Sequence, residues 1–314
     1  MEISMHEHRK APRPQVVPSV PSPKQGLAKM TCLICSSTDI APYRIANGYQ
    51  LFECKNCQLL STDLTNISPD FLHHFYKNDY YGEKHNEAES AFGYDSYVKD
   101  AIIWQKNAEK IVSQALRSMP GKRPLRILDI GCAHGFLVKE AVNQGLDGWG
   151  IDFSDEAIRY AREGLGLKSV ILGDFMSYPL ELNSYDVVVL NGTLEHFVDP
   201  LIVLKRCHEI LAPGGVLIDI TLHHRCGLLG WVTLKPPEHL YYFKCSNLRL
   251  LHQRAGFIEQ IQLKHYWKYY SLAQYIKLLA RMIPYPFKWF SNIKFFERFA
   301  LLFPTNEVII TARK

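Results

Sequence analysis

From Pro124 onward, short apolar runs alternate with segments of helical spacing, and this alternation constrains the fold more than any other feature. The runs LRILDI, GWGID, SVILGDF, YDVVVLNG and VLIDIT predict five strands, and HGFLVKEAVNQG, SDEAIRYAREG and DPLIVLKRCHEILAPGG predict helices among them. The pattern indicates right-handed crossovers and a parallel, doubly wound α/β sheet with helices on both faces. Ligands of such sheets bind beyond the carboxyl ends of the strands. The residues that follow each run therefore form the candidate site.

The first run leads into the loop GCAHG, which begins at Gly131 and ends at Gly135. A phosphate-binding P-loop requires Lys and then Ser or Thr after its last glycine, whereas Phe136 and Leu137 follow here. A dinucleotide-binding turn requires G-x-G-x-x-G, whereas this loop is the tighter G-x-A-x-G. The spacing suits neither of these two ligand classes.

The loop resembles the first motif of the class I S-adenosylmethionine-dependent methyltransferases, D/E-x-G-x-G-x-G. Asp129, Gly131 and Gly135 match, and Ala133 stands where the family has its middle glycine. The extra methyl group costs little unless the residue needs a positive φ angle. The resemblance implies S-adenosylmethionine as the cofactor and a Rossmann-like sheet of seven strands, with the terminal EVIITARK as its antiparallel edge strand.

Acids at the ends of the next two strands support this resemblance. Asp152 can accept hydrogen bonds from both hydroxyl groups of a ribose. A nicotinamide enzyme could use an acid at the same position in the same way. The corresponding family positions imply that Asp174 accepts the adenine amino group and that Phe175 packs on the ring; a turn cap is the alternative for Asp174. The cofactor-binding residues that we expect are Asp129, Gly131, Ala133, Gly135, Asp152, Phe153, Asp174, Phe175 and Asn191.

Two histidine-bearing strings follow the fourth and fifth strands. In LNGTLEHFVDP, Glu195 and His196 are expected where the cofactor and acceptor meet, and L-E-H-x-x-D-P recurs in the methyltransferases that act on ubiquinone precursors and sugars. In PPEHLYYF, the E-H-L-x-x-F string resembles that of zinc-ribbon sugar C-methyltransferases, in which the histidine is the base. This resemblance implies that His239, preceded by Glu238, is the general base, a role that histidine suits near neutral pH.

His196 is the second candidate for the base, and His223 and His224 are candidates for lining the same pocket. A loop histidine that only hydrogen-bonds its neighbours is the alternative for each.

Four cysteines form two C-x-x-C pairs separated by eighteen residues, and they are Cys32, Cys35, Cys54 and Cys57. Four thiolates at this spacing suit tetrahedral zinc and leave no open coordination position, so the metal is expected to support folding. Reduced, unligated cysteines are the alternative. The intervening YRIANGYQLFEC predicts a hairpin that turns at Asn47 and Gly48.

A chain of 314 residues that is 47% hydrophobic can bury one large core and carry a smaller appendage. In the connector, we expect a helix from about Val98 to Ser118. The connector's tyrosines before this helix either pack on the main domain or form a lid, with Tyr80, Tyr81, Tyr94 and Tyr97 as the lid candidates. The expected division is a disordered, proline-rich tail at 1–29, a zinc ribbon at 30–68, a helical and aromatic connector at 69–120, and a methyltransferase domain at 121–314 with an aromatic, basic helical insertion at 261–303.

Charge is concentrated at two segments: residues 1–29 and 261–303 are basic, while the body between them is net acidic. The chain is therefore not expected to be a general nucleic-acid binder. Residues 266–303 predict two helices that either lie on an anionic membrane surface, or roof the site or pair with another subunit. The opening MEISMHEHRK lacks an export signal, so we expect a cytoplasmic protein, with contact at the inner membrane face as one alternative.

The expected function is methyl transfer from S-adenosylmethionine to a small or glycan-like acceptor, with a nucleotide-linked or lipid-linked sugar favoured. An RNA methyltransferase is the first alternative, although the fourth strand lacks the N/D-P-P-Y/F string of many base-methylating enzymes. A non-catalytic zinc-ribbon adaptor that retains a cofactor-binding fold is the second alternative.

Overall fold

The computed structural model describes residues 30–65, 67–68, 71–72, 75, 100–122, 124–224, 234–257, 259–272, 274 and 300–314. The tail predicted at 1–29 and most of the connector, including the four tyrosines proposed as a lid, lie outside the described residues. The connector helix is present as α2, Ala101–Ser118.

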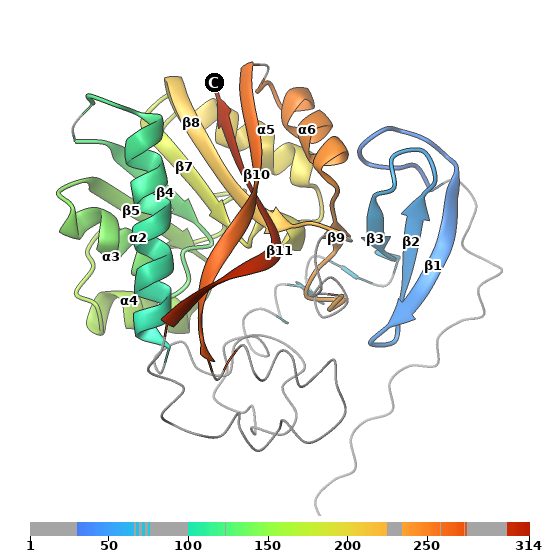
Figure 1. Ribbon diagram of the computed structural model, residues 1–314, viewed down its shortest axis with the longest axis horizontal. Helices are drawn as coiled ribbons and strands as arrows, with labels where there is room; N and C mark the ends of the chain where they lie inside the picture. Colours follow the sequence, from blue (N-terminus) through green and yellow to red (C-terminus); the bar gives the residue numbers. More distant parts are fainter. Residues whose placement is uncertain are drawn as a thin grey trace, which may run out of the picture. The chain divides into compact units, whose positions relative to one another are not determined.

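Within the described residues, seven strands form one sheet in the order β10-β11-β8-β7-β4-β5-β6 (Figure 1). β8, β7, β4, β5 and β6 are parallel to one another, and β11 pairs antiparallel with both β8 and β10. This is the predicted Rossmann-like α/β sheet. The strands are β4 Arg126–Ile130, β5 Asp147–Asp152, β6 Val170–Leu172, β7 Tyr185–Asn191, β8 Leu211–Leu222, β10 Glu259–Ser271 and β11 Ala300–Arg313.

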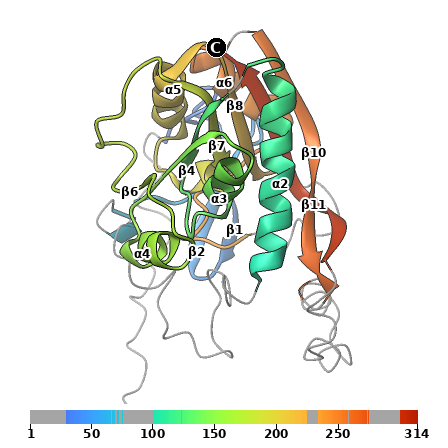
Figure 2. The same ribbon diagram turned by 90° about the vertical axis from the view of Figure 1, so that its left-hand side faces the viewer.

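Helices cover both faces of the sheet. On one face α2 and α3 lie side by side (Figure 2), and on the other face α5 and α6 pack against the sheet. In the described part of the chain, no helix is long and apolar enough to cross a membrane. The remaining helices are α3 Phe136–Asn143, α4 Asp155–Glu163, the 3-10 helix η2 Leu194–His196, α5 Pro200–Ile210 and α6 Cys245–Arg254.

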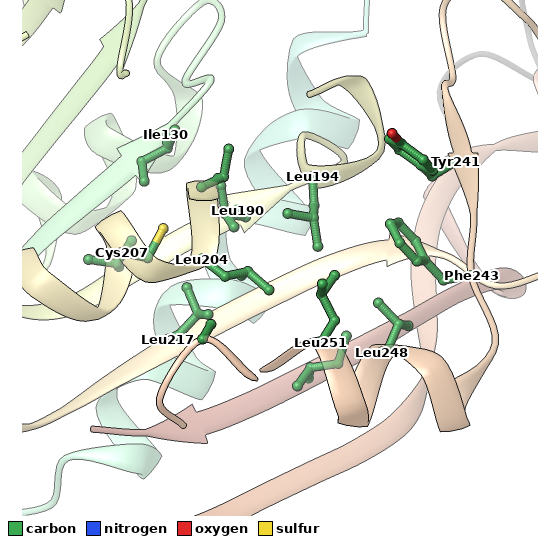
Figure 3. Packing of buried hydrophobic residues seen from close by; sticks show 14 of the residues in the cluster. Ile130, Leu190, Leu194, Leu204, Cys207, Leu217, Tyr241, Phe243, Leu248 and Leu251 are labelled. Carbon is green, nitrogen blue, oxygen red and sulfur yellow. The ribbon is translucent and has the colours of Figure 1, made fainter. Parts of the chain in front are cut away.

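The central strand β7 is apolar on both faces because helices cover both. Val187 and Val189 enter the cluster beneath α2, while Val188 and Leu190 enter the cluster beneath α5 and α6. A continuous apolar run is therefore required here, in place of the alternating pattern of a half-exposed strand. Figure 3 shows part of the second cluster, and its labelled members are Ile130, Leu190, Leu194, Leu204, Cys207, Leu217, Tyr241, Phe243, Leu248 and Leu251.

Local capping fixes where two helices begin. The Ser154 side chain accepts the N–H of Ala157 at the start of α4, at 3.3 Å. Asp199 accepts the N–H groups of Leu201 and Ile202 at the start of α5, at 3.0 and 3.1 Å. These bonds satisfy amide groups that lack partners within the helix, so the aspartate of the LEHFVDP string has a structural role.

The N-terminal cysteine segment forms the expected hairpin. β1, Ile40–Ala46, pairs antiparallel with β2, Tyr49–Cys54, and the turn residues Asn47 and Gly48 have φ angles of +48° and +81°. Positive φ angles at both turn residues are typical of a two-residue hairpin turn. β3, Leu60–Thr62, and β9, Tyr241–Tyr242, complete a four-stranded sheet in the order β1-β2-β3-β9.

The C-terminal part differs from the prediction in two ways. Residues 266–271, expected to be helical, continue β10, and residues 300–303 belong to β11; residues 275–299 lie outside the described residues. Burial here alternates with a period of two, since Tyr266 and Lys268 are buried while Trp267 is 48% exposed, which is the pattern of a strand. The terminal EVIITARK is not an edge strand, because β11 lies between β8 and β10.

Candidate functional site

The loop after β4 folds tightly against the end of β5. The N–H groups of Gly131 and Cys132 both donate to the carbonyl oxygen of Ile151, at 2.9 and 3.2 Å. Gly131 and Gly135 have φ angles of +71° and +81°, which glycine adopts at little cost. The loop thereby turns back along the sheet at the carboxyl ends of its strands, where the cofactor is expected.

Ala133 also has a positive φ angle, of +47°. This is the condition under which the extra methyl group is expected to be costly, since an L-residue in this region carries a strain of about 1–2 kcal/mol. The N–H of Ala133 donates to Oδ2 of Asp152 at 2.9 Å, and this bond helps to hold the strained conformation.

Gly131 leaves no room for a side chain. A Cβ atom built there would lie 2.8 Å from Cγ2 and 2.9 Å from Oγ1 of Thr193, which is at the start of η2. The Thr193 hydroxyl in turn donates to the carbonyl oxygen of Ile130, at 3.2 Å. The loop and the end of β7 therefore approach each other closely, and any side chain at Gly131 must push them apart.

Asp129 and Asp152 are both buried beside this loop. Asp152 accepts the N–H of Ala133 with Oδ2 and that of Ser154 with Oδ1, at 2.9 and 2.8 Å. Oδ1 of Asp129 has no hydrogen-bond partner among the described residues. Burial, with a smaller contribution from the charge of Asp152, raises the pKa of Asp129 to about 8, and burial also raises the pKa of Asp152.

The buried carboxyl group of Asp129 suits a cationic ligand. Among the described residues, no Lys, Arg or His forms an ion pair with Asp129 or Asp152. Buried carboxylates normally have such partners, because leaving them unpaired is costly. S-adenosylmethionine carries a sulfonium and an ammonium group, so the residues present fit this cofactor. We expect Asp129 to face its charged end and Asp152 its ribose hydroxyls.

The remaining predicted cofactor residues lie around the same strand ends. Asp174 is exposed beyond β6 and accepts the N–H of Met176 at 3.0 Å and the hydroxyl of Ser177 at 3.2 Å, so its geometry is that of a turn cap. Phe175 is buried against the Phe197 ring, with centroids 6.4 Å apart. Their adenine-binding roles stay predictions, as do those of the two half-buried residues Phe153 and Asn191.

The structure brings the three predicted catalytic residues together. The rings of His196 and His239 are 5.1 Å apart, and Nδ1 of His196 lies 2.6 Å from the carbonyl oxygen of Glu238. A carbonyl only accepts, so Nδ1 of His196 carries the proton. Nε2 of His239 lies 3.4 Å from Oε1 of Glu238. η2 supplies the first histidine and the turn before β9 supplies the other two residues.

Glu195 joins this cluster, although sequence reasoning gave it no catalytic role. One carboxylate oxygen of Glu195 and one ring nitrogen each of His196 and His239 all lie within 4.8 Å of one another. Oε2 of Glu195 accepts the hydroxyl of Thr221 at 2.8 Å, and the side chain is buried. Burial raises its pKa to about 7, against the opposing effect of His239. Its position beside His196 in L-E-H was the available sequence signal.

The members of this cluster differ in their charge at neutral pH. Burial alone would raise the pKa of Glu238, but the charge and hydrogen bond of His239, with the charge of Lys235, bring it to about 2. Burial, with the charge of His239, lowers the pKa of His196 to about 4. At neutral pH an anionic Glu238 and a neutral His196 therefore flank His239, so a proton taken up by His239 is stabilised by Glu238.

His223 and His224 follow β8, as predicted, but their ring contacts lie elsewhere. The His224 ring meets Tyr43 of the hairpin edge-on, with centroids 5.9 Å apart, and the His223 ring faces His265 at 6.5 Å. Their role in lining the acceptor site stays a prediction.

The four hairpin cysteines converge on one point. Sγ of Cys32 lies 3.5 Å from Sγ of Cys57, Sγ of Cys35 lies 3.5 Å from Sγ of Cys54, and all four sulfurs lie within 4.8 Å of one another. Zinc–sulfur bonds of about 2.3 Å place sulfurs roughly 3.8 Å apart in a tetrahedron, so the cluster fits the predicted zinc. All four are free thiols.

Residues 103–258 match the sequence profile of a family described as "Methyltransferase domain". The chain contains a class I S-adenosylmethionine-dependent methyltransferase domain. Ubiquinone biosynthesis O-methyltransferase of Bordetella avium is 30% identical over 118 residues, which cover 36% of this chain and 47% of that protein. Norajmaline N-methyltransferase of Rauvolfia serpentina is 30% identical over 159 residues, 46% of this chain and 54% of that protein. The chain thus spans about half the length of these curated relatives.

Solved structures match the chain at lower identity. An S-adenosylmethionine-dependent methyltransferase from Archaeoglobus fulgidus has a TM-score of 0.49 and 17% identity, covering 67% of this chain and 94% of its own. Phospholethanolamine N-methyltransferase 2 of Haemonchus contortus has a TM-score of 0.47 and 18% identity, covering 70% of this chain and 58% of its own. The family assignment rests on the sequence match over residues 103–258.

The buried carboxyl group of Asp129 predicts an unusual pH dependence of stability. Its pKa is about 8 in the folded chain against an ordinary 3.8, so the fold binds this proton more tightly than the unfolded chain does. Its contribution is therefore complete below about pH 4 and is lost as the pH rises through about 8. Asp129→Asn is expected to stabilise the cofactor-free protein at pH 8, relative to wild type, by on the order of 1–3 kcal/mol, and by much less at pH 5.

Urea unfolding of the cofactor-free protein at the two pH values measures this difference. Asp174→Asn is the matched control, because its carboxylate is exposed and should give the same small change at both. Equal pH dependence in wild type and Asp129→Asn would show that Asp129 is ionised at little cost.

Proposed function

We propose that the chain transfers a methyl group from S-adenosylmethionine to a hydroxyl group or acidic carbon of a small, glycan-like acceptor, with a nucleotide-linked or lipid-linked sugar as the expected class. His239 takes the proton from the acceptor. The observation that carries this proposal is the buried cluster in which His239 lies between an anionic Glu238 and a neutral His196.

The chain's own residues have three tasks in this reaction. S-adenosylmethionine, when bound, supplies a methyl group already activated by its sulfonium leaving group. The loop at Gly131, with Asp129 and Asp152, holds the cofactor beside the ends of β4 and β5. His239 accepts the acceptor's proton, and Glu238 stabilises the imidazolium that forms. Because methyl transfer is an in-line displacement, alignment of the acceptor is expected to supply most of the rate enhancement.

Support for a small acceptor comes from the relatives, whose names denote methylation of a ubiquinone precursor and of norajmaline. Support for a sugar comes from the E-H-L-x-x-F string beside a cysteine ribbon, which resembles the sugar C-methyltransferases. The position of His239 in the cluster is compatible with either O- or C-methylation, since both require removal of a proton.

The ribbon gives little support to the RNA alternative. In residues 30–65, Arg44 and Lys55 are the only Lys or Arg residues, and Lys55 already forms an ion pair with Glu53 at 2.6 Å. A ribbon that holds RNA would need several basic and stacking side chains along its hairpin. Membrane contact through residues 266–303 and a cytoplasmic location stay expectations from the sequence.

Labelled methyl transfer tests the proposal. The purified protein is incubated with methyl-labelled S-adenosylmethionine and fractionated cell extract, and the label is counted in soluble small molecules, lipid and RNA. We expect label in the soluble or lipid fraction that resists ribonuclease and that forms at least about 100-fold more slowly with His239→Asn. Label in RNA would support the RNA alternative, and tight cofactor binding without label in any fraction would support the adaptor.

Replacement of Glu238 by glutamine is expected to change the pH profile of the reaction. The anionic carboxylate favours protonated His239, while Glu195, His196 and Tyr242 also face this ring. Without the carboxylate the base stays neutral to lower pH, so the acid limb of kcat/KM should move down by about one pH unit or more. The pH dependence of kcat/KM with an accepted substrate measures the shift, and an unmoved acid limb would separate Glu238 from the base.

A further inference from the structure

The cysteine ribbon is continuous with the segment that carries His239. β3, Leu60–Thr62, pairs with β2 along one edge and with β9, Tyr241–Tyr242, along the other. β9 begins two residues after His239, so the last strand of the ribbon is hydrogen-bonded to the chain next to the proposed base. The separation of Thr62 and His239 is 177 positions in sequence.

Thr62 holds the backbone of the proposed base directly. Its hydroxyl donates to the carbonyl oxygen of His239 at 3.0 Å, and its N–H donates to the carbonyl oxygen of Leu240 at 2.8 Å. The N–H of Leu240 donates to the carbonyl oxygen of Glu195 at 2.9 Å. The peptide between His239 and Leu240 is thus held by the ribbon on its carbonyl side and by η2 on its amide side. Thr62 is 1% exposed, so water does not replace its hydroxyl bond.

The cysteine cluster is linked to Thr62 through short backbone contacts. The N–H of Cys54 donates to the carbonyl oxygen of Leu59 at 3.0 Å, immediately before β3. The carbonyl oxygen of Cys57 accepts the side-chain amide of Asn247 on α6 at 3.4 Å. Leu33 lies between Cys32 and Cys35, the other cysteine pair, and its carbonyl oxygen accepts a hydrogen bond from Arg254 at the end of α6, at 2.9 Å. Both pairs are therefore attached to the methyltransferase domain.

A second contact reaches the same segment from the hairpin turn. Nδ2 of Asn47 donates to the carbonyl oxygen of Pro236 at 3.2 Å, three residues before His239. Leu51 and Leu60 of the ribbon form an apolar cluster with Leu222 at the end of β8 and with Tyr242 of β9. Apolar packing and hydrogen bonds thus both tie the ribbon to residues 236–242, and movement of one requires movement of the other.

We propose that Thr62 is a positioning residue for His239, and that the ribbon with its cysteine cluster is a structural part of the acceptor site. This inference rests on the proposed role of His239 as the base. The physical reason is that His239 itself belongs to no helix or strand: it lies in the turn before β9, and the Thr62 and Glu195 contacts hold the backbone of that turn. A base displaced by a fraction of an ångström loses much of its rate advantage.

The test compares Thr62→Val, which keeps the shape but removes the hydroxyl, with Thr62→Ser, which keeps the hydroxyl. Thr62→Val is expected to lower kcat by about threefold to tenfold, as the loss of one buried hydrogen bond allows, with the affinity for S-adenosylmethionine unchanged. Thr62→Ser is expected to restore kcat to within about twofold of wild type. Ser61→Ala, at the half-buried neighbouring position, is the control that should change neither quantity.

A second readout does not depend on turnover. Histidine labelled with carbon-13 at Cε1 gives one resonance for His239, assigned by its disappearance in His239→Asn. Thr62→Val should shift this resonance, Thr62→Ser should not, and removal of zinc from the full chain with a chelator should shift it in wild type. Asn47→Gly removes the second contact at an exposed turn that glycine accommodates, so it serves if Thr62→Val does not fold, with a smaller shift expected.

An unmoved His239 resonance in Thr62→Val, or in Asn47→Gly if the first variant does not fold, would overturn the inference. So would equal kcat in Thr62→Val and Thr62→Ser. The proposed function fails separately, if His239→Asn keeps normal turnover. In that case the resonance still reports whether the ribbon positions His239.

Discussion

Replacement of His239 by asparagine is expected to lower kcat by about 100-fold or more, with the dissociation constant for S-adenosylmethionine within about twofold of wild type. General base catalysis typically contributes 10²-fold to 10⁴-fold, and His239 is the histidine that lies beside the anionic Glu238. The variant keeps a polar side chain in a buried position that contacts His196 and Tyr242. Single-turnover methyl transfer and a separate cofactor titration measure the two quantities.

Two other histidines serve as comparisons for this result. His196→Asn tests the second candidate, and it should cost less than His239→Asn because burial lowers the pKa of His196 to about 4, which makes it a weak base near neutral pH. His265→Asn is a control at an exposed position on β10, where turnover should stay near normal. If His239→Asn is near normal and His196→Asn is not, the base has been assigned to the wrong histidine.

Replacement of Gly131 by arginine is expected to weaken S-adenosylmethionine binding by at least about 100-fold, which corresponds to roughly 2.7 kcal/mol. A Cβ atom at this position lies 2.8 Å from Cγ2 of Thr193, and the φ angle of +71° disfavours any L side chain. The larger group would clash with Thr193 at the start of η2 and displace the loop that Asp152 holds. Isothermal titration with S-adenosylmethionine gives the affinity directly.

Gly145→Arg is the matched control for this substitution. Gly145 has a φ angle of +74°, and a Cβ atom there would meet nothing within 4 Å. The two variants therefore carry similar backbone strain, of about 1–2 kcal/mol, but only the one at Gly131 lies in the loop predicted to bind the cofactor. Loss of affinity in both variants to the same degree would point to general destabilisation and would remove the evidence that this loop binds the cofactor.

Asp152 shows why a simple alanine substitution would be ambiguous in this site. Sequence reasoning predicted only a ribose contact, whereas the carboxylate also accepts the N–H groups of Ala133 and Ser154. Asp152→Ala would therefore disturb the strained loop as well as remove a hydroxyl acceptor. This second role depends on the approach of β5 to the loop after β4, which no local pattern in the sequence reveals.

The helical prediction for residues 266–271 failed for a related reason. The segment YWKYYS mixes aromatic and basic residues with no clear periodicity, so its composition was compatible with a helix. In the structure its backbone pairs with β11, and the burial of Tyr266 and Lys268 follows from α2 and Glu307 beside it. Pairing with a distant strand decided the secondary structure, which context commonly does for strands.

The sequence alone determined the α/β class, the glycine loop after β4, the two acids at the strand ends and the quartet of cysteines. These features follow from hydrophobic periodicity and from short motifs, and both are properties of neighbouring residues. The tertiary structure decided which groups surround His239, that Glu195 joins them, and that the ribbon holds the turn before β9. Residues 62 and 239 meet only because β3 and β9 pair, and a contact over such a distance along the chain depends on the whole fold.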